Sequence, residues 1–231
     1  TTIGADRLRH LTDQPDKVHL VYHGLSFDRF PTDPPERSHA DGSDAAMPVR
    51  LLSVGRAVEK KGFDVLLESL AALPPELQWR WSHVGDGKII EKLRQRADEL
   101  GLSDRIEWLG ARDQQAVIDL YRTSDLFVLP CREASDGDRD GLPNVLMEAQ
   151  SQALPCLSTD FSEIPELIRD GETGVLVPPA EVAPLASALE RLMRSPDERA
   201  KLGMAGYRRV RSCFEAESGI RKIAMLLRQI M

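Results

Sequence analysis

The sequence predicts an α/β fold, a Rossmann-like parallel sheet flanked by helices. From residue 49 onward, short apolar runs alternate with longer amphipathic ones, which is the pattern of strands joined by crossover helices. The run LFVL at 126–129 is apolar throughout and is stopped by Pro130, as expected of a strand buried on both faces. It is followed by DGLPNVLMEA at 140–149, which opens a helix. Strand, loop and helix in that order are the repeating unit of such folds.

The predicted elements follow from this alternation. We expect strands at 49–54, 79–84, 106–109, 126–129, 155–158 and 174–177. We expect helices at 63–72, 88–100, 114–123, 143–152, 163–169, 182–194, 196–212 and 218–230. Asp113 before one helix, Gly101 after another and Pro196 at a first turn are typical end signals. Because ligands bind beyond the carboxyl ends of the strands in open parallel sheets, we expect the site at that edge.

We divide the chain into three parts. Residues 1–48 read as an interdomain crossover, with one strand at 18–22 and a Pro- and Asp-rich surface loop at 31–48. Residues 49–195 form the Rossmann-like core. Residues 196–231 add helices that pack on the core, toward a further domain. The chain begins at Thr1 without an initiator Met, from which we expect a fragment.

Composition and charge narrow the function. The net charge of −7 argues against nucleic acid as a partner, and no apolar run approaches 18 residues. With no signal peptide and three scattered cysteines, we expect a cytoplasmic protein. From Arg191 onward there are ten Lys or Arg against four Asp or Glu. We read this basic tail as a solvated face over an apolar stripe; the alternative is peripheral contact with an anionic inner membrane.

The turn that opens the helix at residue 143 suits an anion. Gly141 permits a tight bend, and Pro143 fits the first helical turn. The free backbone N–H groups at 142–145 would point at a phosphate. Glu148 lies about one turn later, where its carboxylate can accept hydrogen bonds from a ribose, and Asp140 faces whatever the far phosphate carries. The predicted phosphate cradle consists of Gly141, Leu142, Pro143, Asn144 and Val145.

A second basic loop follows the first strand. Arg56 offers a planar fork to two phosphate oxygens, and Lys61 offers a mobile point charge. Together they can clamp a diphosphate from the side opposite the helix N-terminus. The alternative is that Lys60 and Lys61 are solvated loop charges.

Both loops resemble those of a known family. DGLPNVLMEA is similar to the E-x7-E motif of retaining glycosyltransferases of the GT-B fold, of the group 1 or family-4 type, with Asp140 in place of the first Glu. VGRAVEKKGFDVLLESL resembles their G-R-x4-K-G segment, and the run at 162–178 resembles their P-E-L-x-x-D-G segment. The resemblance covers about residues 18–231 and only the C-terminal, donor-binding half of such an enzyme.

The resemblance implies a donor-binding domain that helps transfer a hexosyl group from a UDP- or GDP-sugar to a saccharide or lipid-linked acceptor, in bacterial surface polysaccharide synthesis. It gives catalytic roles to Arg56, Lys61 and Asp140, and donor contacts to Gly55 and Leu109 besides the cradle. Glu148 would bind the ribose. The expected partner is the N-terminal acceptor domain of the same protein, without which this chain would transfer nothing. Asp for Glu shortens the reach of residue 140, which leaves the donor sugar open.

Other sites are less well supported. The run DGDRDG at 136–141 approaches a calcium loop, but Met147 stands where its last ligand should be and a strand precedes it. The strand–loop–helix setting also disfavours the metal-binding D-x-D of the other glycosyltransferase fold. GDG at 85–87 lacks the third glycine of a NAD fingerprint. The five histidines show no metal spacing, so we expect neither a metal nor another cofactor.

Two other functions remain open. One is a nucleotide-sugar epimerase of GT-B-like fold, which would turn over without an acceptor. The other is a non-catalytic nucleotide-sugar-binding module, in which Glu148→Gln would leave the activity of the whole protein unchanged.

Overall fold

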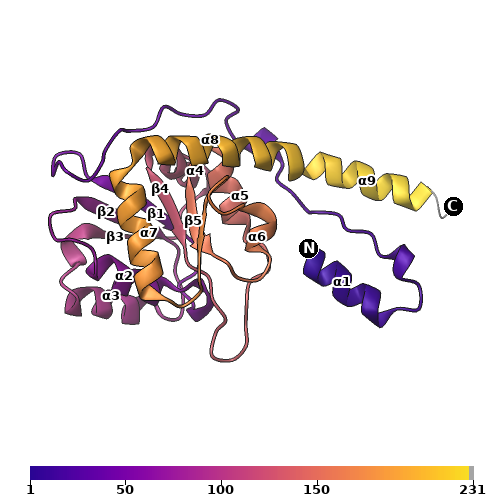
Figure 1. Ribbon diagram of the computed structural model, residues 1–231, viewed down its shortest axis with the longest axis horizontal. Coiled ribbons are helices and arrows are strands. Elements are labelled where there is room, and N and C mark those ends of the chain that lie inside the picture. Colours follow the sequence, from indigo (N-terminus) through magenta and orange to yellow (C-terminus); the bar gives the residue numbers. More distant parts are fainter. Residues whose placement is uncertain (229–231) are drawn as a thin grey trace.

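The computed structural model describes residues 1–228, and its centre is a six-stranded parallel sheet (Figure 1). The strands are β1 (Val49–Val54), β2 (Trp79–Val84), β3 (Ile106–Gly110), β4 (Leu126–Leu129), β5 (Cys156–Thr159) and β6 (Val175–Val177). They are ordered β3-β2-β1-β4-β5-β6, and every neighbouring pair is parallel. The predicted Rossmann-like sheet is confirmed, and each strand lies within one residue of its predicted bounds.

Helices cover both faces of the sheet (Figure 1). The helices of the described chain are α1 (Thr2–Leu11), α2 (Phe63–Ala71), α3 (Ile90–Glu99), α4 (Gln114–Thr123), α5 (Asn144–Ser151), α6 (Ile164–Leu167), α7 (Val182–Arg194), α8 (Pro196–Cys213) and α9 (Ala216–Arg228), of which α1 and α9 lie away from the sheet. Two predicted helix-end residues are confirmed. The Asp113 side chain caps α4 by accepting from the N–H of Ala116 at 2.8 Å, and Gly101 follows α3 with φ of +69°. The predicted last residues of α9, up to 230, lie outside the described part of the chain.

The core lies where helices from both faces press on the middle of the sheet. All residues of β4 and β5 are buried, as the continuous apolar run of β4 predicts for that strand. α2 packs against α7, and α5 packs against α8. This arrangement fixes the starts of α2 and α5, which follow β1 and β4, at one edge of the sheet.

The predicted strand at 18–22 is wrong. Within residues 1–228 this segment has no partner strand and runs extended beside α9 instead. The Lys222 ammonium donates to the Leu20 carbonyl at 2.8 Å, and a side chain at Gly219 would meet the Tyr22 carbonyl at 2.7 Å. A short segment rich in strand-forming residues needs a neighbouring strand to become part of a sheet, and here a helix takes that place.

The sequence reading also missed a helix, α1, inside the predicted crossover. Thr1 caps it by accepting from the N–H of Gly4 at 3.2 Å, and its first turn docks on α6. Glu166 accepts from the backbone N–H of Thr2 and from the Tyr22 hydroxyl, both at 2.7 Å. α1 buries only Ala5, so its apolar periodicity is too weak to identify it.

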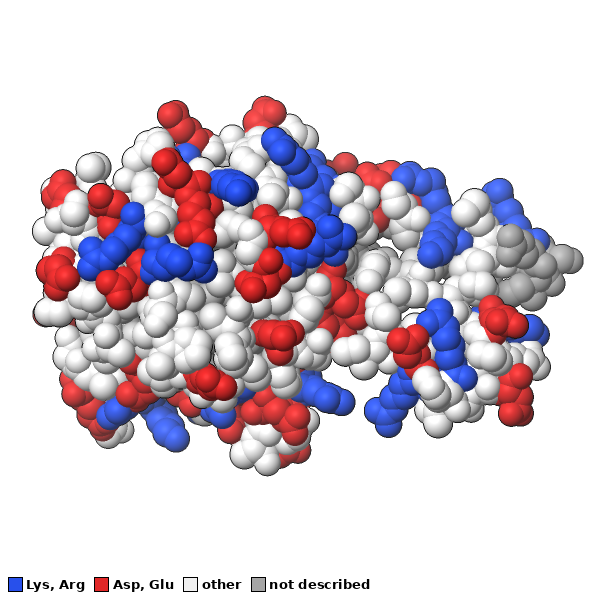
Figure 2. Space-filling view, viewed as in Figure 1, with Lys and Arg blue, Asp and Glu red and all other residues white. Residues whose placement is uncertain are grey.

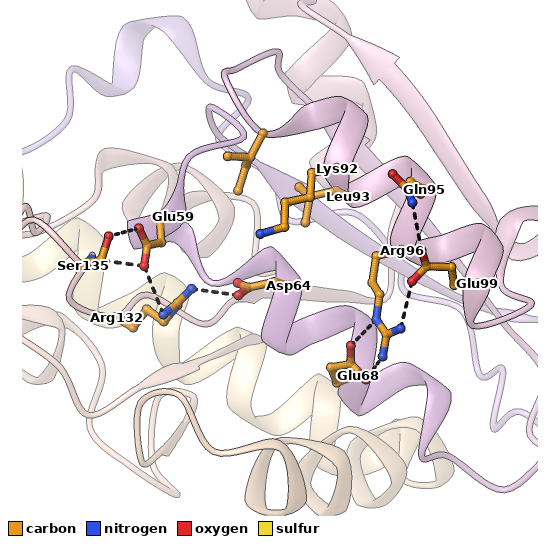
Figure 3. A pocket seen from close by; sticks show the side chains of 11 residues that line it. Glu59, Asp64, Glu68, Lys92, Leu93, Gln95, Arg96, Glu99, Arg132 and Ser135 are labelled. Atoms are coloured by element: carbon orange, nitrogen blue, oxygen red, sulfur yellow. Dashed lines mark hydrogen bonds and ion pairs between the residues drawn. The ribbon is translucent and has the colours of Figure 1, made fainter.

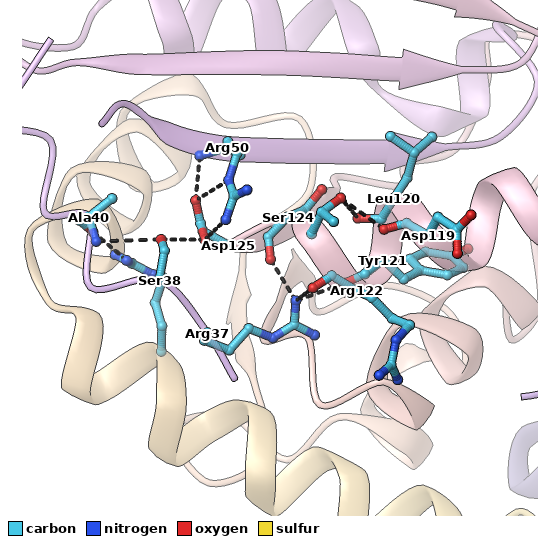
Figure 4. A network of polar contacts seen from close by, with 12 residues as sticks. Arg37, Ser38, Ala40, Arg50, Asp119, Leu120, Tyr121, Arg122, Ser124 and Asp125 are labelled. Carbon is cyan, nitrogen blue, oxygen red and sulfur yellow. Dashed lines mark hydrogen bonds and ion pairs between the residues drawn. The ribbon is translucent and has the colours of Figure 1, made fainter. Parts of the chain in front are cut away.

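The loop at 31–48 is fixed to the core and does not lie free on the surface (Figure 4). The guanidinium of Arg37 is buried and donates to the carbonyls of Tyr121 at 2.8 Å and Ser124 at 2.6 Å, and also to that of Gln152. Burial lowers the pKa of Arg37 to about 10. Polar composition predicts a surface loop correctly but does not indicate which residue turns inward.

The two C-terminal helices differ. α8 packs on the core, as predicted, and a side chain at Gly203 would meet the Ala153 carbonyl at 2.2 Å. α9 buries no residue and projects from the body beside α1, so its predicted packing on the core is wrong (Figure 1). Ile220, Ile223 and Leu227 are exposed on it.

Within residues 1–228, no helix has the length and apolar character needed to cross a bilayer.

Candidate functional site

Backbone hydrogen bonds connect the loops at the carboxyl edge of the sheet to one another. The N–H of Gly55 donates to the Val84 carbonyl, and the N–H of Gly85 donates to the Gly110 carbonyl, both at 2.9 Å. These bonds link the loops after β1, β2 and β3. Gly85 has φ of +131°, and a side chain there would lie 2.2 Å from the Gly55 carbonyl oxygen. Glycine is needed at position 85 because two backbones touch there.

The loops after β1 and β4 are joined in the same way. The N–H of Arg132 donates to the Lys60 carbonyl at 2.9 Å. Gly62 has φ of +68°, and a side chain there would lie 2.0 Å from the Pro130 carbonyl oxygen. Lys60 and Lys61, just before that glycine, are thus held at a fixed distance from the loop that ends in Asp140.

Asp140 binds both lysines. Its Oδ2 lies 2.7 Å from Nζ of Lys61, and its Oδ1 lies 3.2 Å from Nζ of Lys60, which also reaches Asp138 at 3.0 Å. Burial alone would raise the pKa of Asp140, but the hydrogen bonds and charges of Lys61 and Lys60 outweigh it and lower that pKa. The carboxylate is therefore ionised, and the chain itself holds an anion between two ammonium groups.

α5 begins beside this cluster with free donors. Pro143 takes the cap position, with φ of −68° and ψ of 123°, and the helix begins at Asn144, one residue later than predicted. In the described part of the chain, no intramolecular hydrogen bond uses the backbone N–H of Gly141, Leu142, Asn144 or Val145. Four N–H groups at the positive end of a helix are available to an anion.

Two neighbours of this turn come from distant segments. Nε2 of His23 lies 2.6 Å from Oδ1 of Asn144, so the crossover segment touches the first residue of α5. A side chain at Gly141 would lie 3.3 Å from the Glu163 carboxylate, at the start of α6. The absence of a side chain at Gly141 keeps the turn open to a ligand.

Glu148 occupies a more buried place, one turn into α5. Its Oε2 accepts from the hydroxyl of Tyr121, on α4, at 3.0 Å. Burial raises the pKa of Glu148, while this hydrogen bond opposes the rise. Burial also raises the pKa of Tyr121 well above its usual 10, so the hydroxyl keeps its proton and is the donor.

The remaining predicted residues make fewer contacts. Gly55 lies next to the Lys61 side chain, since a side chain at Gly55 would meet its Cε at 3.4 Å. Arg56 is exposed, and among residues 1–228 it makes neither an ion pair nor a side-chain hydrogen bond. Leu109 is half-buried and packs on the core from β3. The structure thus brings Gly55, Lys61 and Asp140 together. Within residues 1–228 the side chain of Arg56 forms no polar contact with Lys61 or Asp140, and Leu109 packs on the core; all the predicted roles stay predictions.

Sequence reasoning missed three residues of this edge. Lys60 appears in the sequence as the first of two lysines, and nothing there separates it from a solvated charge. Tyr121 lies on the apolar face of a helix, where a buried hydroxyl needs a partner, but the sequence does not identify that partner. His23 is missed because its contact with Asn144 joins segments 121 residues apart.

A cavity of about 570 Å³ opens outside this edge, between α2, α3 and the loop after β4 (Figure 3). Each of its arginines bridges two acids: Arg132 reaches Glu59 and Asp64, and Arg96 reaches Glu68 and Glu99. None of the residues predicted to bind a donor lines it. We therefore treat the carboxyl edge, and not this cavity, as the candidate site.

Comparison with known proteins agrees with the sequence reading. Residues 36–209 match the model of the family described as glycosyl transferases group 1. The chain is 31% identical over 228 residues to the putative colanic acid biosynthesis glycosyltransferase WcaL of Salmonella typhimurium, covering 98% of this chain and 54% of that protein. It is 31% identical over 198 residues to the amylovoran biosynthesis glycosyltransferase AmsK of Erwinia amylovora, covering 85% of this chain and 49% of that protein. The chain thus spans about half the length of these curated relatives.

A solved structure shows the same fold. Anabaena HepE, crystallised in complex with UDP and glucose, superposes with a TM-score of 0.80 at 20% identity, over 99% of this chain and 62% of HepE. The predicted GT-B relationship is confirmed. Since the family model matches well over half of the residues, the chain belongs to the glycosyl transferases group 1 family.

Proposed function

We propose that this chain is the nucleotide-sugar-binding part of a retaining glycosyltransferase that uses a UDP- or GDP-activated hexose. One observation carries the proposal. At the carboxyl edge, the ammonium groups of Lys60 and Lys61 hold a carboxylate in the loop that leads into α5, whose first N–H groups are free. A site that already binds one internal anion from two sides suits the two phosphates of a nucleotide diphosphate.

The chemistry that such a site supplies is electrostatic. During transfer the bond between the sugar's anomeric carbon and the diphosphate oxygen breaks, an acceptor oxygen bonds to that carbon, and the acceptor's proton leaves with the diphosphate. Negative charge grows on the diphosphate as the bond breaks. Arg56, Lys61 and the N-terminus of α5 would stabilise that charge, Asp140 would contact the sugar, and Glu148 would hold the ribose.

The rest of the reaction is assigned to the other half of the protein. The names of WcaL and AmsK support an acceptor that belongs to an exopolysaccharide. We infer that an N-terminal domain binds this acceptor and that the present chain binds donor without transferring sugar. Donor binding without a metal is part of the same proposal.

Peripheral contact with an anionic membrane remains a weaker proposal. Figure 2 shows Lys and Arg interspersed with Asp and Glu over the face in view. Several arginines of the basic tail are engaged within the chain: Arg209 donates to the carbonyls of Leu167 and Glu166, and Arg221 pairs with Glu215. These contacts leave fewer guanidinium donors for lipid headgroups, and the Arg221–Glu215 pair also offsets one positive charge. Sedimentation with anionic and neutral vesicles would test the proposal, and equal binding to both would contradict it.

Thermal unfolding with UDP, GDP and ADP, each in EDTA, tests the donor site. A nucleotide at 100 times its dissociation constant adds about 2.7 kcal/mol to the free energy of unfolding. For a chain of this size that raises the midpoint by roughly 5–10 °C. A rise with UDP or GDP supports the proposal, and a rise that needs added Mg²⁺ refutes its metal-free part. No rise with any nucleotide, here and in the full-length protein, refutes the donor site.

A further inference from the structure

The contact between Tyr121 and Glu148 joins two helices at a buried point beside the candidate site. Tyr121 is fully buried on α4, and its hydroxyl donates to Oε2 of Glu148 on α5 at 3.0 Å. Among the described residues no other side chain forms a hydrogen bond or an ion pair with this carboxylate. One of its oxygens is therefore engaged by the protein, and Oε1 is available to a ligand.

The two helices are held together at a second place by Arg37. Its guanidinium donates to the Tyr121 and Ser124 carbonyls, at the end of α4, and to the Gln152 carbonyl, at the end of α5 (Figure 4). A planar fork that bonds several fixed carbonyls cannot move without breaking all of them. The loop that carries Arg37 thus sets the separation of the helices on which Tyr121 and Glu148 stand.

We propose that Tyr121 is a positioning residue of the donor site, which fixes one oxygen of Glu148 so that the other meets the ribose hydroxyls, with Arg37 holding the two helices in register. This inference rests on the proposed function, because it takes Glu148 as the ribose ligand. It goes beyond that function by assigning a role to a residue that touches no part of the donor.

The surroundings of Tyr121 and Glu148 indicate that the hydroxyl also affects the charge state of the carboxylate. Without the hydroxyl, a half-buried carboxylate would lose its one partner, and the acid form of Glu148 would be favoured further. Few other ionisable groups face the pair. Cys156 lies beside Tyr121, and burial raises the pKa of its thiol far above the usual range, so it is neutral. Tyr121 therefore opposes the rise in the pKa of Glu148 that burial causes.

The test uses Tyr121→Phe, which removes the hydroxyl and leaves the ring. Calorimetric titration with UDP and with GDP, between about pH 5 and pH 8, should show roughly fivefold weaker binding for the variant at pH 7, the equivalent of one hydrogen bond. Because binding needs an ionised Glu148, affinity falls as the pH falls. That fall should begin at a higher pH in the variant than in the parent chain.

The chain offers a matched control. Tyr22 donates to Glu166 at 2.7 Å, a tyrosine–glutamate hydrogen bond that includes none of the residues predicted to bind the donor. Tyr22→Phe should leave both the affinity and its pH profile unchanged. A merely structural loss would lower the melting temperature of either variant without moving the pH profile.

A double-mutant cycle completes the test. If Tyr121 acts through Glu148, Tyr121→Phe should add no further loss of affinity to Glu148→Gln. A ¹³C titration of the Glu148 carboxyl, which needs no ligand, should show its pKa raised by Tyr121→Phe and unmoved by Tyr22→Phe.

The outcomes separate the two proposals. Nucleotide binding with an identical pH profile in the parent chain and Tyr121→Phe overturns the positioning role alone. A shift of the profile by Tyr22→Phe overturns it as well. Failure of the parent chain to bind either nucleotide overturns the proposed function and, with it, the role of Glu148 on which the inference rests.

Discussion

The Nζ atom of Lys61 lies 2.7 Å from Oδ2 of Asp140. The cation predicted to bind the donor's phosphates is therefore held by the acid predicted to meet the donor's sugar. Lys60 contacts the other oxygen of the same carboxylate at 3.2 Å. A diphosphate that enters this site has to exchange places with Asp140, and that exchange can be measured.

Asp140→Asn should bind UDP more tightly and transfer sugar less well. The amide no longer competes for the two ammonium groups, so we expect the dissociation constant to fall roughly fivefold. Transfer by the full-length protein should fall because the sugar loses its carboxylate contact. Asp138→Asn, which loosens only Lys60, is the control and should change the affinity less. Weaker UDP binding by Asp140→Asn would contradict the exchange.

Lys61→Ala should weaken nucleotide binding more than Lys60→Ala does. Lys61 makes the shorter bond to Asp140, whereas Lys60 divides its charge between two acids. We expect Lys61→Ala to raise the dissociation constant roughly tenfold to a hundredfold, as for a lost charge-assisted contact. Lys201→Ala, on the exposed face of α8, serves as the control. Equal losses for Lys60→Ala and Lys201→Ala would place Lys60 outside the site.

Glu148→Gln should stabilise the free chain while it weakens nucleotide binding. The folded-state pKa of Glu148 is raised by burial, so its ionised form opposes folding at every pH above that pKa, and the opposition disappears as the pH falls through it. Glutamine removes the charge and can still accept from Tyr121. We expect the melting temperature at pH 7 to rise by roughly 2 °C. Added UDP should raise the melting temperature of the variant by less than it raises that of the parent chain. A variant that melts below the parent chain at pH 7, and at the same temperature as the parent chain at pH 4, would contradict the expected stabilisation.

Arg37→Met should unfold at a markedly lower temperature. The change leaves the carbonyls at the ends of α4 and α5 without their donor. We therefore expect the free energy of unfolding to fall by about 3 kcal/mol, which lowers the melting temperature by roughly 6–12 °C. Arg29→Met is the matched control, since Arg29 is exposed in the same N-terminal region. Differential scanning calorimetry measures both. Equal midpoints would show that the buried arginine contributes nothing.

The sequence predicts the fold well because the evidence for it is local. The apolar run of β4 and the cap at Asp113 each identify an element from a few adjacent residues. The two loops predicted to bind the nucleotide are recognisable for the same reason, since each is one short continuous motif. What these motifs touch is not local: Asp140 bonds lysines on another loop, and nothing in DGLPNVLMEA indicates that.

The errors have the same origin. The segment at 18–22 is rich in strand-forming residues but lies beside a helix, where a sheet would need a neighbouring strand. Arg37 is one of many charged residues in a polar stretch, and its inward turn depends on carbonyls roughly 85 or more residues away. Tyr121 needed a partner, and only the folded structure, in which its hydroxyl bonds to Glu148 on α5, shows which one.

The loops that form the site follow β1 and β4, which are neighbours in the sheet although Arg50 and Asp125, at their starts, are 75 residues apart in the chain. Such distant pairing forms late in folding, because a long loop must close first. The anion site therefore does not exist in partly folded chains that lack the β1–β4 pairing. A bound nucleotide should consequently slow unfolding while leaving the refolding rate almost unchanged, since it meets a finished site only after the barrier has been crossed.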